Sequence, residues 1–102
     1  WNSEQGKPQW ILLKFGRPVE VSQVRIMFQG GFVGQGCSFQ SINEQRQVVD
    51  TWPFYPDDIN YLQPFQLGQT LTTLRIEFQD STDFFGRVTI YQLQVLGAVL
   101  SE

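Results

Sequence analysis

Short runs in which apolar and polar residues alternate are the feature that most constrains the fold of this chain. A period of two places every second side chain on the same face of a β-strand. In one run Leu74, Ile76 and Phe78 share a face, while polar side chains occupy the other. Strands that are apolar on one face are typical of antiparallel sheets packed as a sandwich. No stretch has the period of a long helix, so the pattern predicts an all-β, antiparallel β-sandwich.

Several short strands are expected along the chain. Residues that favour turns separate most of them, as in the Gly16-Arg17-Pro18 triplet. The run at 62–67 is expected to form a short edge strand. The seven expected strands are residues 9–15, 21–29, 37–42, 47–52, 62–67, 72–79 and 87–96.

The last expected strand contains a slip in its alternation. Val88 and Ile90 fall on one face, but the next apolar residue in the pattern is Leu93, which is out of phase with them. A β-bulge inserts one extra residue into a strand and shifts the phase in this way. We therefore expect a bulge near Tyr91 and Gln92.

The composition is that of one folded domain spanning residues 1–102. Hydrophobic residues make up 41% and aromatic residues 15% of the chain, which is enough to form a core. The net charge is −3, and the seven Lys and Arg residues are spread along the sequence. Nucleic acids and anionic membranes attract clustered basic residues, so we expect direct binding to neither. No apolar run approaches the ~20 residues that span a bilayer.

The chain contains no His and a single Cys, Cys37. Zinc sites with imidazole ligands and Ser-His or Cys-His catalysis are therefore excluded within this chain. Asp57 and Asp58 are adjacent, but neighbouring acids cannot flank a glycosidic bond across a cleft, and we interpret them as solvated loop acids. We expect no catalytic residue, no enzyme activity and no cofactor. The lone Cys favours a reducing compartment.

The first candidate partner-binding residues, Phe32 and Val33, lie in a loop with four glycines at 29–36. A phosphate-binding glycine loop opens a helix, and no helical pattern follows here. Phe32 either projects to contact a partner or folds back to plug the open end of the sandwich.

Trp52, Phe54 and Tyr55 form a second candidate group, interrupted and followed by prolines. Proline excludes a central strand. These aromatic residues form either a protein-binding patch or a cover over an open sheet edge. Aromatic rings also stack on sugars, but a sugar site needs convergent polar groups beside the ring. The sequence identifies no such set, so a sugar or other small ligand is not indicated.

Asp83, Phe84, Phe85 and Arg87 form a third candidate group, in the loop before the last strand. We expect one phenylalanine ring to cap the core and the other to be exposed. Arg87 either pairs with Asp80 or Asp83 across the loop, or contacts a partner, as Arg and aromatic residues often do at interface hot spots.

Two segments carry a resemblance to a known family. Residues 10–26 combine Trp10-Ile11 and Phe15-Gly16 with a Val-x-x-Val-x-Ile run, and residues 91–97 read as a closing strand. Together they resemble the discoidin, or factor V/VIII type C, domains. The resemblance implies a jelly-roll β-sandwich of the galactose-binding type. The chain starts at Trp1 without Met, and we expect a fragment that lacks the N-terminal strand and leaves one sheet edge unpaired.

Four motifs are more similar to a small intracellular, receptor-associated branch of this family. They are residues 1–6, 29–32, 54–58 and 82–88. The resemblance implies a non-enzymatic protein-interaction module that is a corepressor-like partner of an orphan nuclear receptor and hinders its DNA binding. The alternative is a carbohydrate- or lipid-binding discoidin module.

Two departures from the family pattern bear on metal binding and location. Gln92 stands where calcium-binding relatives have an acidic residue. A neutral amide is a poorer ligand for Ca²⁺ than a carboxylate, so we expect no metal site. Secreted discoidins have a Cys after the last strand, whereas residues 97–99 contain none. We therefore expect an intracellular protein, and the resemblance implies a location in the nucleus.

Overall fold

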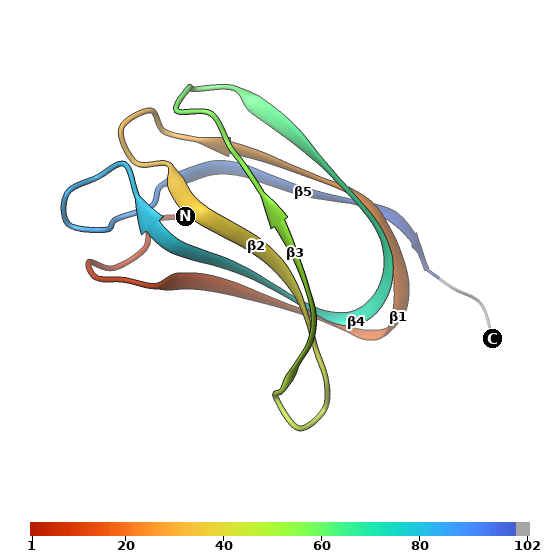
Figure 1. Ribbon diagram of the computed structural model, residues 1–102. Coiled ribbons are helices and arrows are strands. Elements are labelled where there is room, and N and C mark those ends of the chain that lie inside the picture. Colours follow the sequence, from red (N-terminus) through yellow and green to blue (C-terminus); the bar gives the residue numbers. More distant parts are fainter. Residues whose placement is uncertain (100–102) are drawn as a thin grey trace.

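The computed structural model describes residues 1–99, and all its regular elements are β-strands (Figure 1). Neighbouring strands are antiparallel and follow the order β3-β2-β4-β1-β5. The described residues contain no helix, which confirms the all-β prediction. The strands are β1 Gln9–Phe28, β2 Gly34–Ile42, β3 Val48–Phe54, β4 Leu62–Ser81 and β5 Ile90–Val99.

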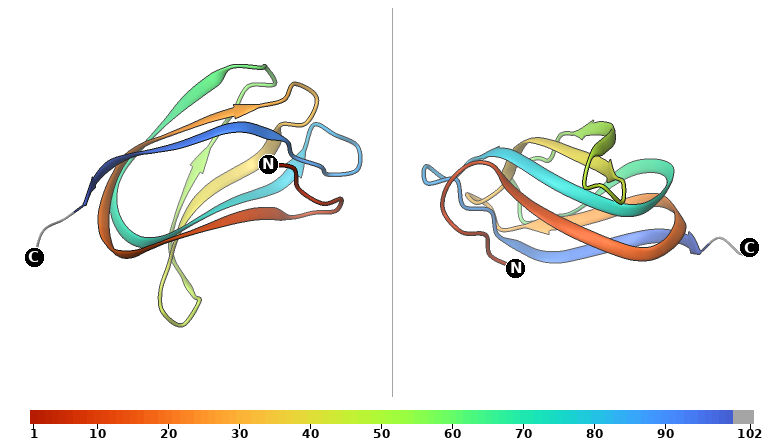
Figure 2. Two further views of the ribbon diagram at one scale, coloured as in Figure 1. Left: turned by 180° about the vertical axis from the view of Figure 1, so that it is seen from behind. Right: turned by 90° about the horizontal axis from the view of Figure 1, so that it is seen from below.

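The long strands β1 and β4 pass through both layers of the molecule. Residues 9–14 of β1 pair with residues 73–78 of β4, and residues 19–27 pair with residues 62–71. β2 and β3 extend the first layer, because β2 pairs with the last part of β4. β5 extends the second layer by pairing with the last part of β1. Figure 2 shows the long strands curving from one layer into the other, which produces the predicted sandwich.

Glycines with positive φ lie at the bends of these strands. The register of β1 against β4 shifts at both bends, and φ is 77° at Gly16 and 64° at Gly68. Glycine adopts such angles without the steric cost of a Cβ atom. The sequence pattern predicted a turn at Gly16 and two separate strands at 62–67 and 72–79. That connectivity is wrong, because β1 and β4 are each one continuous strand, and their pairing resumes after a register shift at each bend.

The core lies between the two layers. Phe28 and Phe78 meet edge to face with ring centroids 5.9 Å apart, and Phe39 stacks on Phe54 at 4.0 Å. Burying a side chain of this size stabilises a fold by about 1.5–3 kcal/mol. The predicted inward faces are confirmed. Side chains with less than 2% exposure include Val24, Ile26, Phe28, Phe39, Leu74, Ile76 and Phe78.

The closing strand contains the predicted bulge. Met27 pairs with Gln92 and Phe28 pairs with Ile90, so Tyr91 is the extra residue. The bulge prediction is therefore confirmed. The strand begins at Ile90 and not at residue 87 as the pattern predicted, although Val88 is fully buried.

Four strand segments lie at sheet edges, and one of them is β5, which pairs with β1 alone among the described strands. Residues 62–71 pair with β1 alone among the described residues, which confirms the predicted edge strand. β3 is the edge of the other layer. Residues 9–14 pair with β4 alone within the described part of the chain. This is an unpaired edge of the kind that the sequence led us to expect.

Candidate protein-interaction surface

Four segments lie at the end of the sandwich away from the C-terminus (Figure 1). We call them the N-terminal segment (residues 1–6), the glycine loop (29–33), the tyrosine loop (55–61) and the phenylalanine loop (82–89). Hydrogen bonds join each segment to a neighbour, although they are distant in the sequence. Together they form one continuous surface, the loop rim.

The tyrosine loop is bound to the glycine loop by side-chain acceptors. The Gly30 amide donates to Asn60 Oδ1 at 2.6 Å, and the Gly31 amide donates to Asp58 Oδ1 at 2.8 Å. Both bonds satisfy backbone donors that no strand pairs. The two loops therefore hold one another in place.

Gln63 closes the base of the tyrosine loop. Its side-chain oxygen accepts from the Asp57 amide at 2.7 Å, and its side-chain nitrogen donates to the Asp57 carbonyl at 2.9 Å. Gln63 is only 8% exposed. Its amide uses one acceptor and one donor here, so the loop is fixed by uncharged hydrogen bonds.

The glycine loop is joined in turn to the phenylalanine loop and the N-terminal segment. The Val33 amide donates to Thr82 Oγ1 at 3.0 Å, and the Thr82 amide donates to the Val33 carbonyl at 2.9 Å. The Ser3 amide donates to the Val88 carbonyl at 2.9 Å, and Ser3 Oγ accepts from the Val88 amide at 2.8 Å. The loop rim is thus a set of interlocked turns.

An ion pair between Asp83 and Arg87 organises the phenylalanine loop. Arg87 Nε donates to Asp83 Oδ2 at 2.9 Å, and Arg87 Nη2 donates to Asp83 Oδ1 at 3.1 Å. Oδ2 also accepts from the Phe85 and Arg87 amides, each at 3.1 Å. The hydrogen-bonded guanidinium lowers the pKa of Asp83 to about 2. Arg87 was expected to pair with Asp80 or Asp83 or to contact a partner, and the structure pairs it with Asp83, while Asp80 pairs with Lys7.

Arg87 also supports the aromatic side chains around it. Its guanidinium carbon lies 5.3 Å from the centre of the Phe32 ring and 5.4 Å from that of Phe85. Phe84 and Phe85 meet edge to face at 5.2 Å, and they are 87% and 53% exposed. We expected one ring to cap the core. That expectation is wrong, because the Asp83 turn holds both rings at the loop tip, and Val33 is the buried residue there.

The other candidate residues divide between the core and the surface. Val33 and Phe54 are 1% and 5% exposed, so they contribute almost no area to a contact surface. Trp52 is half-buried against the core, which agrees with the alternative that it covers a sheet edge. Phe32 is half-buried beside Arg87. Tyr55 is 81% exposed and remains available to a partner.

A hollow of about 320 Å³ opens beside the Phe32 ring. It brings together the convergent polar groups that the sequence did not identify. Thr89 Oγ1 donates to Asn2 Oδ1 there at 3.0 Å. The hollow is lined by Asn2, Ser3, Gln29, Phe32, Arg87 and Thr89.

The described residues contain neither a cluster of metal ligands nor a membrane-spanning helix. No group of three or more Cys, Asp and Glu side chains within residues 1–99 could hold a metal ion. No helix among those residues is long and apolar enough to cross a membrane.

Comparisons with known proteins identify the family. The chain is 48% identical over 98 residues to the nuclear receptor 2C2-associated protein of Xenopus laevis, covering 95% of this chain and 72% of that protein. The human protein of the same name is 46% identical over 101 residues, covering 95% of this chain and 70% of its own length. The chain belongs to the nuclear receptor 2C2-associated proteins. No family model matches the chain.

Solved structures show the fold of this family member. The C-terminal domain of a chitobiase from Bacteroides fragilis superposes with a TM-score of 0.71 at 15% identity, covering 99% of this chain and 74% of that one. A fucose-binding module of Streptococcus pneumoniae gives 0.66 at 12% identity, covering 93% and 69%. These similarities confirm the predicted galactose-binding-like β-sandwich.

Sequence reasoning missed two exposed apolar residues of the tyrosine loop, Ile59 and Tyr61. They are 40% and 69% exposed. Tyr61 directly precedes the expected strand at 62–67, so the alternation of that strand was not extended to it. A second tyrosine near Tyr55, with Pro56 between them, was the available signal. These residues enlarge the exposed apolar area of the loop rim.

Proposed function

We propose that this chain is a non-enzymatic module that binds a nuclear receptor through its loop rim. The shared name of its relatives supports a receptor partner. We further propose that the chain acts in the nucleus as a corepressor-like partner of an orphan nuclear receptor. Its binding hinders the attachment of that receptor to DNA.

The exposed pair Phe84 and Phe85 is the observation that carries this proposal. Both rings lie on a loop whose backbone is braced by the Asp83–Arg87 ion pair. Aromatic side chains dominate the energetics of many interfaces. A loop that is ordered before binding loses less conformational entropy when the complex forms. The pair therefore has the properties of an interface anchor.

The receptor role can be tested by measuring binding of the full-length protein to nuclear receptor 2C2. We expect a dissociation constant in the micromolar range or below, and about a ten-fold or larger loss for Phe84→Ala with Phe85→Ala. Tyr91→Ala is the matched control, because Tyr91 is 58% exposed on β5, outside the loop rim. Absence of binding by the unaltered protein at micromolar concentration would contradict the receptor role.

The effect on DNA binding needs a separate measurement. In a gel-shift assay with the receptor and its DNA element, we expect the unaltered protein to reduce the bound fraction. The Phe84→Ala, Phe85→Ala variant should reduce it far less. A ternary complex with an undiminished amount of bound DNA would contradict the repressor mechanism and leave the association itself intact. A fluorescent fusion of the full-length protein tests the nuclear location.

A second candidate function is supported by the hollow beside Phe32. Its polar side chains and its aromatic ring have the chemistry of a small sugar site. Retention on a glycan array that is lost in Gln29→Ala would support sugar binding. We choose Gln29 for this variant because Arg87 also holds the phenylalanine loop. No retention of the unaltered protein on the array would contradict sugar binding.

A further inference from the structure

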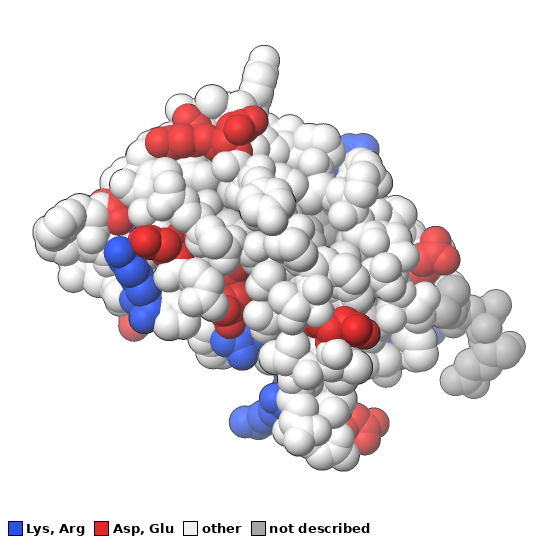
Figure 3. Space-filling model, in the orientation of Figure 1, with Lys and Arg blue, Asp and Glu red and all other residues white. Residues whose placement is uncertain are grey.

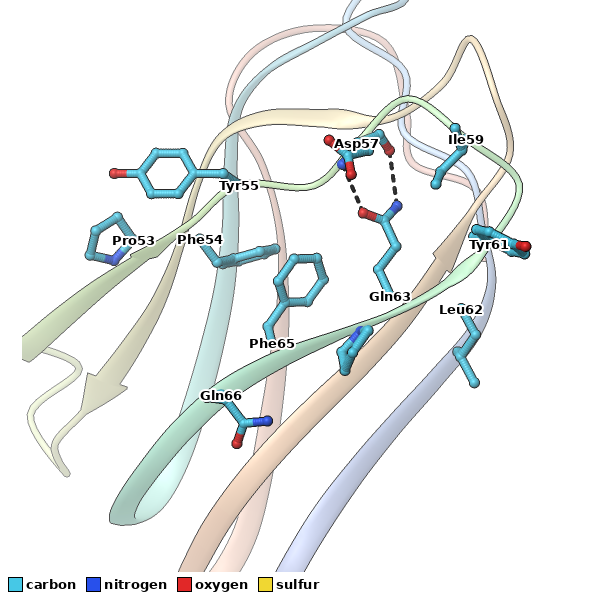
Figure 4. A pocket seen from close by; sticks show the side chains of 11 residues that line it. Pro53, Phe54, Tyr55, Asp57, Ile59, Tyr61, Leu62, Gln63, Phe65 and Gln66 are labelled. Carbon is cyan, nitrogen blue, oxygen red and sulfur yellow. Dashed lines mark hydrogen bonds between the residues drawn. The ribbon is translucent and has the colours of Figure 1, made fainter.

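A groove runs along the side of the sandwich where the edge strands of the two layers face one another. Residues 53–57 form one wall, from the end of β3 onward, and residues 62–66 at the start of β4 form the other. Its volume is about 550 Å³. Figure 4 shows the rings of Phe54 and Phe65 side by side between the walls, and their centroids are 4.7 Å apart. We call this the tyrosine groove.

Each wall of the tyrosine groove carries a proline. Pro53 lies in β3 and Pro64 lies in the first part of β4, and each of these segments is an edge of its layer. Proline has no N–H to donate, and natural edge strands use it to resist the addition of another strand. An occupant of this groove is therefore held by side-chain contacts and not by a new strand of the sheet.

Exposed apolar side chains surround one end of the groove. Tyr55 is 81% exposed, Tyr61 is 69% exposed and Ile59 is 40% exposed. Figure 4 shows the two tyrosines on opposite sides of the hydrogen-bonded Asp57 and Gln63. The loop between them is held by Gln63 and by the glycine loop, so the tyrosines project from a fixed backbone.

The charged residues of the groove lining and of the tyrosine loop are acidic, and Arg25 on the neighbouring strand β1 pairs with Pro64 of the lining. No Lys or Arg occurs between Arg46 and Arg75 in the sequence, whereas Asp57 and Asp58 lie in the tyrosine loop. Both are exposed, and neither forms an ion pair with another described residue. Figure 3 shows acidic atoms gathered over this loop at the top of the view.

We infer that the tyrosine groove docks a basic segment of a protein partner, in which Arg or Lys stands beside an apolar residue. A guanidinium or ammonium group binds the face of a tyrosine ring, and the two carboxylates add opposite charge. Arg suits such a site best, because its planar group both stacks and donates to carboxylates. The neighbouring apolar residue covers the exposed part of Phe65. The inference relies on the proposed function only for the existence of a protein partner.

Two probes test the groove in the full-length protein. The first is a synthetic peptide of alternating arginine and leucine, and its control replaces each arginine with glutamate. The second is nuclear receptor 2C2. The test variant is Asp57→Asn with Asp58→Asn, which keeps the acceptor for the Gly31 amide and removes the charge. Asp50→Asn is the matched control, an exposed acid on β3 outside the groove lining.

We expect the arginine peptide to bind and to shift the NMR signals of Tyr55 and Tyr61, with no shift from the glutamate peptide. The double Asn variant should bind both probes about five-fold more weakly, and Tyr55→Ala about ten-fold more weakly. Asp50→Asn should change neither affinity. Added salt should weaken binding of the arginine peptide to the unaltered chain.

The outcomes separate this inference from the proposed function. Receptor binding that depends on Phe84 and Phe85 but is unchanged by the Asn variant overturns the inference alone. Arginine-peptide binding at the tyrosines without any receptor binding supports the groove and contradicts the receptor role. An equal response to both peptides overturns the inference, because charge would then not decide the occupant.

Discussion

The phenylalanine loop and the tyrosine loop both present aromatic residues at the loop rim, but different chemistry holds them. A charged pair, Asp83 and Arg87, closes the phenylalanine loop. The Asp83 carboxylate is therefore already bound within the loop. The tyrosine loop is closed by the uncharged amides of Gln63 and Asn60, together with one hydrogen bond from the Gly31 amide to Asp58 Oδ1. As a result, the carboxylates of the tyrosine loop form no ion pair within the described residues, and they remain available to a partner.

This difference predicts unequal sensitivity to the solvent. The ion pair of the phenylalanine loop is partly exposed, and such pairs are weakened by salt and by protonation of the acid. The side-chain amides of Gln63 and Asn60 do not ionise in the pH range in which a carboxylate takes up a proton. Four measurements test this contrast between the two loops.

The largest effect is expected for Gly86→Ala in the phenylalanine loop. Gly86 has φ 79°, and a Cβ there would lie 2.6 Å from the Gly6 carbonyl oxygen. We expect unfolding free energy to fall by about 2–4 kcal/mol, measured by denaturant titration. Gly31→Ala is the control, because φ is 85° there but nothing lies within 4 Å. Its expected loss is about 1 kcal/mol, and equal losses would show that the contact with Gly6 is unimportant.

A smaller loss is expected for Gln63→Ala at the base of the tyrosine loop. The change leaves the Asp57 amide and carbonyl without their side-chain partners. We expect a loss of about 1–3 kcal/mol in unfolding free energy and faster hydrogen exchange at the Asp57 amide. Gln66→Ala is the matched control, since Gln66 is exposed on the same strand. If exchange at Asp57 were unchanged, Gln63 would not be the residue that closes this loop.

An acid titration should loosen the Asp83–Arg87 closure of the phenylalanine loop and leave the amide closures at Gln63 and Asn60 unchanged. The pKa of Asp83 is about 2 in the folded protein and near 3.8 ordinarily, because Arg87 donates to the carboxylate. A folded-state pKa below the unfolded value contributes stability that is complete above about pH 4 and is lost as the pH falls through about 2. NMR shifts of the Phe85 and Arg87 amides should follow this midpoint. The acceptor of the Gly30 amide, Asn60, is uncharged. An NMR shift of the Gly30 amide with the same midpoint would therefore contradict the difference between the two loops.

The smallest effect on stability is expected for Phe84→Ala. Its ring is 87% exposed, so truncation removes little buried area. We expect the unfolding free energy to change by less than about 0.5 kcal/mol, while receptor affinity falls. A thermal or denaturant scan alongside the binding assay checks this. A large stability loss would show that the ring supports the fold and is not a free anchor.

Much of the fold could be predicted from local pattern. The inward faces of residues 72–79 and 21–28 follow from alternation, since a strand has a period of two wherever it lies. The bulge at Tyr91 was visible as a phase slip for the same reason. The continuity of β1 through Gly16 was not visible, because a glycine two residues before a proline is compatible with a turn and with a bend in a strand.

Less of the interaction surface could be predicted. The sequence indicated that Arg87 had two possible acids, and the loop geometry selected Asp83. It indicated Val33 and Phe54 as candidates with their exposed neighbours, but burial depends on which element packs over a residue. Both lie in the core, at 1% and 5% exposure.

The sequence by itself determined the class of fold, the faces of the strands, the closing bulge and the family, because these depend on residue order and on nearest neighbours along the chain. The tertiary structure alone decided how the loop rim is assembled. Asn60 meets Gly30 and Ser3 meets Val88 across long sequence separations. Such contacts exist only once the long strands β1 and β4 have bent around the core. That bending brings the phenylalanine and tyrosine loops into one surface.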